Sequence, residues 1–102
     1  MTKYRSHMHE FKYKGSKLFV ENVSVESVVQ KTGTPAYIYS YKTLTDHFLK
    51  LQKAFSSIDA LICYSIKSNS NIAVVRALSK LGSGFDVVSG GELFRACAAG
   101  AD

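Results

Sequence analysis

Several features that define specialised classes of protein are scarce in this sequence. It has one proline and seven glycines among 102 residues, which excludes collagen-like and disordered compositions. Its apolar runs are far shorter than the roughly 20 residues that cross a membrane. No basic segment precedes a long apolar core, as it would in a secretory signal. We therefore expect a cytoplasmic globular protein without a membrane partner.

Cysteine and histidine are also too few and too widely separated to suggest a metal or redox centre. Cys63 and Cys97 form no C-x-x-C pair, and their apolar surroundings predict two buried free thiols. His7 and His9 lie near the start of the chain, and His47 stands alone. Because a zinc site needs three or four converging ligands, the sequence predicts none.

The charge balance is basic, with 13 Lys and Arg residues against 8 Asp and Glu residues, a formal net charge of +5. Six basic residues lie in the first third of the chain, where acidic residues separate them and aromatic residues interleave with them. A nucleic-acid surface usually clusters its positive charge around stacking aromatics. The dispersed pattern favours a solvated surface, and no nucleic-acid partner is expected. The six are Lys3, Arg5, Lys12, Lys14, Lys17 and Lys31.

The first 40 residues predict small β-elements around one helix. Residues 1–10 are expected to be an N-terminal extension, and residues 11–20 a hairpin that turns at Lys-Gly-Ser. Ser24 is a predicted N-cap of a short helix that ends at Gly33, just before a proline. Residues 36–40 (A-Y-I-Y-S) predict a compact strand.

From residue 41 onward, the sequence alternates between helix and strand patterns. A strong amphipathic helix, with Phe48 on its apolar face, is followed by an apolar run suited to a buried parallel strand. Asn71 is expected to cap the next helix. Such alternation predicts a parallel α/β sheet. A closed eight-stranded barrel needs about 250 residues, so the chain is expected to be a truncated part with an unpaired sheet edge. The later elements are expected at 60–67 (strand), 71–82 (helix), 85–88 (strand) and 92–99 (helix).

Lys67 is the residue at which this pattern suggests chemistry. It ends a predicted strand and precedes the polar loop Ser68-Asn69-Ser70-Asn71. In parallel α/β folds the carboxyl ends of the strands face the active site. Partial loss of hydration there favours the neutral amine, which attacks carbonyl groups. A solvated strand terminus is the alternative explanation of Lys67.

Two acidic residues could accompany this lysine. Asp86 lies on the following predicted strand, at the same carboxyl-end level, and could steer the amine of Lys67; its alternative role is an ordinary cap or ion-pair partner. Glu92 opens the last predicted helix, where interaction with the helix dipole would by itself account for an acid.

Three segments together resemble the fold-type-III pyridoxal-phosphate decarboxylases, and among them the diaminopimelate decarboxylase family. They are G-T-P-A-Y-I-Y at 33–39, Y-S-I-K-S-N at 64–69 and G-S-G-F-D-V-V-S-G-G-E-L at 82–93. Usual family members read Y-A-V-K-A-N in the second segment, so Ser65 and Ser68 stand where alanine is common. The resemblance extends from about residue 11 to residue 102.

This resemblance implies a fold, a cofactor and a reaction. The fold would be a partial (β/α)8 TIM barrel of the alanine racemase-like type from residue 41 to 102, with residues 11–40 contributing to a β-domain. Lys67 would carry pyridoxal 5'-phosphate as a Schiff base, and Asp86 and Glu92 match acidic positions near it. The full-length enzyme would be a homodimer that decarboxylates meso-2,6-diaminopimelate to L-lysine, whereas the 102-residue chain alone is expected to show no turnover. An ornithine or arginine decarboxylase, or a non-catalytic cofactor-binding relative, remains the alternative.

Overall fold

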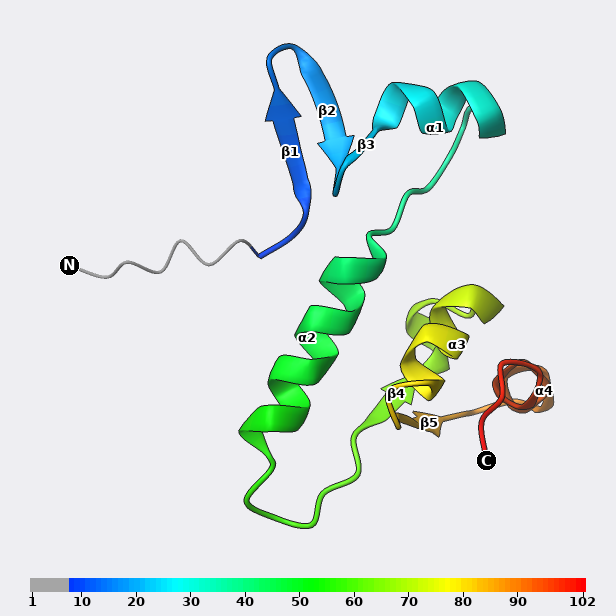
Figure 1. Ribbon diagram of the computed structural model, residues 1–102. Helices are drawn as coiled ribbons and strands as arrows, with labels where there is room; N and C mark the ends of the chain where they lie inside the picture. Colours follow the sequence, from blue (N-terminus) through cyan, green and yellow to red (C-terminus); the bar gives the residue numbers. More distant parts are fainter. Residues whose placement is uncertain (1–7) are drawn as a thin grey trace. The chain divides into compact units, whose positions relative to one another are not determined.

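The computed structural model describes residues 8–102, and the chain divides into two compact units, Met1–Leu44 and Thr45–Asp102 (Figure 1). Most of the N-terminal extension predicted for residues 1–10, including His7, lies outside the described residues. Between residues 8 and 102, no helix combines the length and the apolar character needed to span a membrane.

The first unit contains a three-stranded antiparallel sheet in the order β1-β2-β3. Strands β1 (Phe11–Lys14) and β2 (Lys17–Val20) pair so that Lys14 faces Lys17 across a two-residue turn. Gly15 occupies the left-handed region at φ 62°, which glycine adopts without steric cost. The structure thus confirms the predicted hairpin and adds the short strand β3 (Val23–Ser24).

Helix α1 (Val25–Thr32) has the boundaries that its capping residues predict. The Ser24 hydroxyl accepts a hydrogen bond from the backbone N–H of Ser27 at 3.1 Å. At the other end, Gly33 has φ 79°, and its N–H bonds to the carbonyl of Val29 at 2.7 Å. Both cap predictions are confirmed.

The strand predicted at residues 36–40 is absent, so this prediction is wrong. Tyr37 and Tyr39 alternate along an extended segment and are 91% and 63% exposed. Alternation of side chains is a property of one chain, but a strand also needs a neighbour for its backbone N–H and C=O groups. Within the described residues no strand pairs with this segment.

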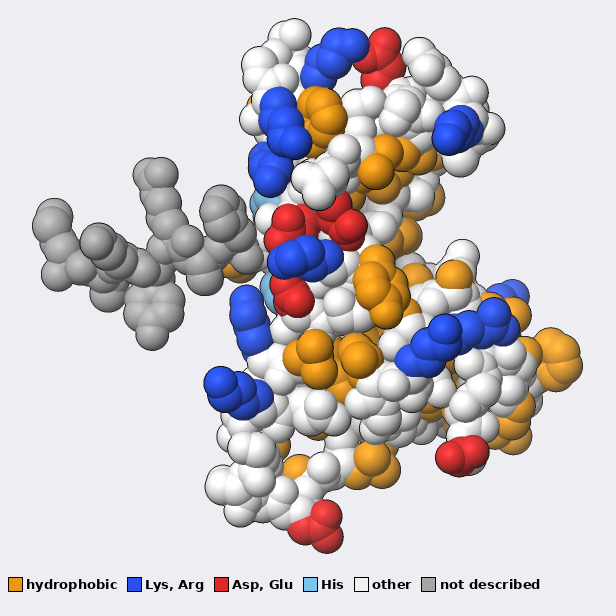
Figure 2. Space-filling view, viewed as in Figure 1, with side chains coloured by type: hydrophobic (Ala, Val, Ile, Leu, Met, Phe, Trp, Pro, Cys, Tyr) orange, Lys and Arg blue, Asp and Glu red, His pale blue; other side chains and the backbone are white. Residues whose placement is uncertain are grey.

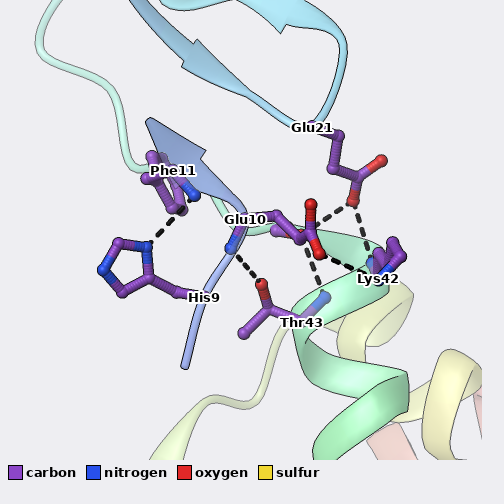
Figure 3. Close-up of polar contacts among 7 residues, drawn as sticks. His9, Glu10, Phe11, Glu21, Lys42 and Thr43 are labelled. Atoms are coloured by element: carbon purple, nitrogen blue, oxygen red, sulfur yellow. Dashed lines mark hydrogen bonds and ion pairs between the residues drawn. The ribbon is translucent and has the colours of Figure 1, made fainter. Parts of the chain in front are cut away.

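A network of hydrogen bonds fixes the start of helix α2 (Tyr41–Ala54) within the first unit (Figure 3). The Ser40 hydroxyl accepts from Thr43 N–H at 3.0 Å and donates to Glu21 Oε1 at 2.7 Å. Glu21 Oε1 also accepts from Lys42 N–H at 2.9 Å, while Lys42 Nζ pairs with Glu10 Oε1 at 2.8 Å. The backbone N–H of Lys42 and the Ser40 hydroxyl lower the pKa of Glu21 below its ordinary value.

Helix α2 itself is confirmed, but its predicted apolar face is only partly buried. Phe48 is 8% exposed, whereas Leu51 and Phe55 remain 46% and 45% exposed. Within the second unit, the side-chain amide of Gln52 donates to the carbonyl of Leu81 at 3.3 Å. The four- and three-residue spacing therefore located the helix correctly and overstated how much of its face is covered.

The second unit consists of two successive strand–helix pairs. Strand β4 (Cys63–Ser65) continues into a single 3-10 turn, η1 (Ile66–Ser68), and then into α3 (Ile72–Ser79). Strand β5 (Gly84–Asp86) follows and leads to α4 (Gly90–Ala98). The strands pair in parallel, with Cys63 opposite Gly84 and Ser65 opposite Asp86. The predicted parallel β-α-β-α order is confirmed, with shorter strands than expected.

The core of this unit lies where one face of β4 and η1 meets the two helices. Ile66 and Val75 are fully buried and pack with Ala96 and Ala99. Tyr64 joins the edge of this cluster and meets Phe85 edge to face, with ring centroids 6.4 Å apart. Tyr64 and Ile66, on one face of the predicted strand, therefore pack toward the helices.

The two cysteines are free but exposed, which corrects the prediction of buried thiols. Cys63 points to the strand face opposite Tyr64, and its neighbour on that face, Leu61, is 72% exposed. Cys97 follows the buried Ala96 on α4 and turns outward. Apolar neighbours in sequence indicate a regular element but do not determine which of its faces is covered.

Charged side chains of both signs are mixed on the visible surface. Figure 2 shows Lys and Arg side chains interspersed with Asp and Glu, without one continuous basic patch on that face. Among residues 8–102, no three His, Cys, Asp or Glu side chains group as metal ligands.

Candidate cofactor-binding site

The candidate site begins at Lys67, in the 3-10 turn that follows β4. Ile66, its neighbour, is fully buried and anchors the turn to the core, whereas Lys67 is exposed. Its amine has no hydrogen bond or ion pair with any of the residues 8–102. The structure thus differs from the expected partial burial, because no element of the described chain covers the end of β4. A free amine at this place remains able to react with a carbonyl.

Asp86 lies at the carboxyl end of β5, directly opposite Ser65 in the parallel ladder. The Ser65 hydroxyl donates a hydrogen bond of 2.7 Å to Asp86 Oδ2. Lys67 follows Ser65 by two residues in the chain. The predicted placement of Asp86, on the neighbouring strand at the same level, is therefore confirmed by the pairing. The sequence analysis missed the role of Ser65 as its hydrogen-bond donor.

Glu92 occupies the first turn of α4 and takes part in capping that helix. The Ser89 hydroxyl accepts from the N–H of Glu92 at 3.1 Å, and Glu92 Oε2 accepts from the N–H of Val88 at 2.7 Å. This arrangement resembles a capping box, and it places a negative charge near the positive end of the helix dipole. Glu92 Oε1 has no hydrogen bond among the described residues.

The polar loop after Lys67 is fixed from two sides. The Tyr64 hydroxyl donates to the carbonyl of Asn69 at 3.1 Å, and Arg95 of α4 donates to the carbonyl of Ser70 at 3.2 Å. Asn71 caps α3 by accepting from the N–H of Ala73 at 2.9 Å, as predicted. Sequence reasoning did not identify Arg95, because nothing local connects it with a loop 25 residues away.

A hollow in the second unit borders on the candidate site without including its three residues. A cavity of about 390 Å³ adjoins β5 and α4, and Leu61, Phe85 and Leu93 belong to its mainly apolar lining. Neither Lys67, Asp86 nor Glu92 lines it. Lys67, Asp86 and Glu92 lie just beyond β4, at the end of β5 and at the start of α4, and this end of the ladder is the candidate site.

The second unit has parallel strand–helix pairs and an unpaired lysine just beyond the end of a strand. This arrangement is typical of α/β proteins whose active sites lie at the carboxyl ends of the strands. Comparison with known families narrows this class. Residues 41–102 match the model of the family described as pyridoxal-dependent decarboxylase, pyridoxal binding domain. The chain belongs to this family.

Individual relatives agree with the family match. Diaminopimelate decarboxylase of Haemophilus influenzae is 47% identical over 95 residues, which cover 93% of this chain and 23% of the relative. The Aquifex aeolicus enzyme of the same name is 47% identical over 88 residues, 86% of this chain and 20% of the relative. The chain thus spans about a fifth of the length of these relatives.

Solved structures show the same likeness in three dimensions. The diaminopimelate decarboxylase of M. jannaschii, solved in co-complex with L-lysine, matches with a TM-score of 0.81 at 32% identity, over 87% of this chain and 22% of that one. Together with the family match, this confirms the predicted fold class, a partial (β/α)8 barrel of the alanine racemase-like type.

Proposed function

We propose that the protein to which this chain belongs is a pyridoxal-phosphate-dependent amino-acid decarboxylase that converts meso-2,6-diaminopimelate to L-lysine, a step of lysine biosynthesis. The observation that carries the proposal is the unpaired, exposed amine of Lys67 at the end of a parallel strand, inside the segment that matches the family. The diaminopimelate decarboxylase names of the relatives, and the lysine in one solved relative, support this choice of substrate and product.

The side chains at the strand ends fit the chemistry of this cofactor. An aldehyde needs a nucleophilic amine, and Lys67 Nζ is not engaged by any carboxylate of the described chain. Lys67 Nζ would bond to the aldehyde carbon of pyridoxal phosphate, and the aldehyde oxygen would leave as water. When bound, the cofactor supplies a ring that takes up the electron pair left on Cα as carbon dioxide departs.

Two carboxylates would complete the part of the site that this chain contributes. Asp86 is proposed to interact with the cofactor near Lys67, because it shares the strand-end level and keeps Oδ1 outside its bond to Ser65. Glu92 is proposed as a cofactor-binding residue through Oε1, since Oε2 is occupied by the N–H of Val88.

Trapping of the bound cofactor tests this assignment. The intact protein is loaded with pyridoxal phosphate, reduced with borohydride, digested and analysed by mass spectrometry. We expect the cofactor mass on the peptide that contains Lys67, and no such mass on that peptide in Lys67→Arg, which keeps the charge without the reactive amine. Lys31, which is exposed in the other unit, offers the control Lys31→Arg. Labelling elsewhere, with Lys67 unmodified, would refute the proposal.

The substrate is tested separately, by release of carbon dioxide from diaminopimelate, ornithine and arginine. We expect turnover of diaminopimelate by the intact protein. Activity restricted to ornithine or arginine would refute diaminopimelate as the substrate, and the assignment as an amino-acid decarboxylase would stand. Labelling of Lys67 without turnover of any of the three would favour a non-catalytic cofactor-binding relative.

The organisation of the whole protein is proposed on the same basis. We infer that residues 11–40 contribute to a β-domain, that residues 41–102 begin the cofactor-binding barrel, and that the enzyme works as a cytoplasmic homodimer. Light scattering during size-exclusion chromatography of the intact protein tests the proposed homodimer directly. A monomeric mass at assay concentrations would remove the dimer from the proposal.

A further inference from the structure

Ser65 holds one oxygen of the carboxylate that lies closest along the ladder to Lys67. Its hydroxyl donates to Asp86 Oδ2 over 2.7 Å, a usual length for an O–H···O hydrogen bond. The bond follows from the strand register, because residues directly opposite in the parallel pair present their side chains on the same face. Among residues 8–102, Asp86 has no other hydrogen bond or ion pair.

This bond affects what Lys67 can do. Asp86 is the acidic residue at the level of the strand ends, yet no ion pair between it and Lys67 forms in the described chain. An ion pair would hold the amine in its charged form, and the charged form does not attack an aldehyde. The hydrogen bond from Ser65 holds Asp86 Oδ2 at the β4–β5 ladder and so keeps that oxygen from pairing with Lys67.

We propose that Ser65 is a positioning residue that anchors the Asp86 carboxylate on β5 and so keeps Lys67 available to the cofactor. The inference rests on the proposed function and goes beyond it, because it concerns a side chain with no part in the chemistry itself. The hydrogen bond between Ser65 and Asp86 is then expected to set how fast the cofactor attaches.

A pair of variants isolates the hydroxyl. Ser65→Thr and Ser65→Val have nearly the same shape, and both β-branched side chains suit a strand, but only threonine can donate to Asp86. Ser68→Ala is the matched control, because Ser68 lies on the other side of Lys67 and is exposed without a hydrogen bond in the described part of the chain.

The rate of cofactor attachment to the intact apoprotein is followed by visible absorbance, and borohydride reduction confirms Lys67 as the attachment site. We expect Ser65→Val to slow attachment about fivefold, the size of effect that a single net hydrogen bond produces. Ser65→Thr should stay near the rate of the wild type, and Ser68→Ala should be unchanged. If Ser65 only stabilised the fold, its variants would have lower melting temperatures, but Ser65→Val and Ser65→Thr would attach the cofactor at the same rate.

A double-mutant cycle then asks whether Ser65 acts through Asp86. In an Asp86→Ala background, which removes the acceptor of the bond, Ser65→Val and Ser65→Thr should attach the cofactor at equal rates. Equal rates in the presence of Asp86, or a valine defect that persists without it, would overturn the positioning role. If the wild type itself leaves Lys67 unlabelled, the proposed function fails, and the positioning role fails with it. If Lys67 is labelled but Ser65→Val and Ser65→Thr attach the cofactor at the same rate, only the positioning role is refuted.

Discussion

Replacing Glu21 is expected to loosen the junction between the hairpin and the start of helix α2. Its carboxylate accepts from the Ser40 hydroxyl and the Lys42 N–H, and each such bond contributes about 0.5–1.5 kcal/mol net. Solvent near the carboxylate favours the lower end of that range. We therefore expect Glu21→Ala to cost about 1–2 kcal/mol. Glu21→Gln keeps an acceptor oxygen and loses only the charge near the helix N-terminus, about 0.5–1 kcal/mol.

The backbone conformation of Glu21 makes a second contribution to the free energy of unfolding, opposite in sign to that of its hydrogen bonds. Its φ of 55° lies in the left-handed region, which costs non-glycine residues about 1 kcal/mol. Alanine carries the same backbone cost as glutamate, so Glu21→Ala reports the side chain alone. Glu21→Gly loses the same hydrogen bonds but relieves this cost, and its net loss should be smaller than that of alanine.

The pKa of Glu21 is lowered on folding, which fixes the sign of the pH dependence. A depressed carboxyl pKa contributes stability that is complete above the ordinary value of 4.5 and is lost as the pH falls through the folded-state pKa. The destabilisation by Glu21→Gln should therefore be present near neutral pH and shrink in acid. A constant difference from neutral to acidic pH would contradict the role of the charge.

Amide hydrogen exchange of Lys42 is the most direct measurement, because this N–H donates to Glu21. We expect faster exchange at Lys42 in Glu21→Ala, with amides of α3 unaffected. Asp59→Asn removes the same charge from an exposed position without a hydrogen bond in the described chain, and should change nothing. Unaltered protection of Lys42 in Glu21→Ala would refute the reasoning.

Two further changes test the second unit. A Cβ at Gly84 would lie 2.7 Å from Cys63 Sγ and 3.1 Å from Leu61 Cδ2, so these exposed side chains must rotate and Gly84→Ala should cost up to about 1 kcal/mol in urea unfolding. Gly90→Ala, with open space around it, should cost nothing, and equal midpoints would show that both side chains rotate freely. Glu92→Gln keeps an acceptor for the N–H of Val88 and removes the charge, so the stability contributed at the start of α4 should fall by less than about 1 kcal/mol. Cofactor binding, measured by equilibrium dialysis, should weaken. Undiminished binding would remove Glu92 from the cofactor-binding residues.

Features determined by neighbouring residues were predictable from the sequence. The turn at Gly15 and the caps at Ser24 and Asn71 depend on side chains within three residues of the backbone groups that they satisfy. Helix α2 could be located because its apolar period is long and regular. The order of strands and helices followed, and with it the parallel pairing that brings Asp86 to the end of the β4 ladder.

Features that depend on distant parts of the chain were not predictable. The segment at 36–40 has the composition of a strand but no pairing partner among the described residues. The exposure of Cys63 and Lys67 depends on which elements cover one face of β4, and local apolarity does not encode this. The bond between Ser65 and Asp86 joins residues 21 positions apart. Only the register of the parallel ladder, which places Ser65 opposite Asp86, supplies this partner.

The turn after β4 connects the core with the candidate chemistry through adjacent residues. Ile66 is fully buried against Val75 and Ala96, so the turn is held by the packing of α3 and α4. Ser65, one residue earlier, reaches across to β5, and Lys67, one residue later, is left exposed and unpaired within residues 8–102. Three consecutive side chains therefore have separate roles, one in packing, one in holding a carboxylate and, under the proposed function, one in binding the cofactor. Because Lys67 directly follows the buried Ile66, the backbone from which its side chain extends is fixed by the core and not by a contact of the amine.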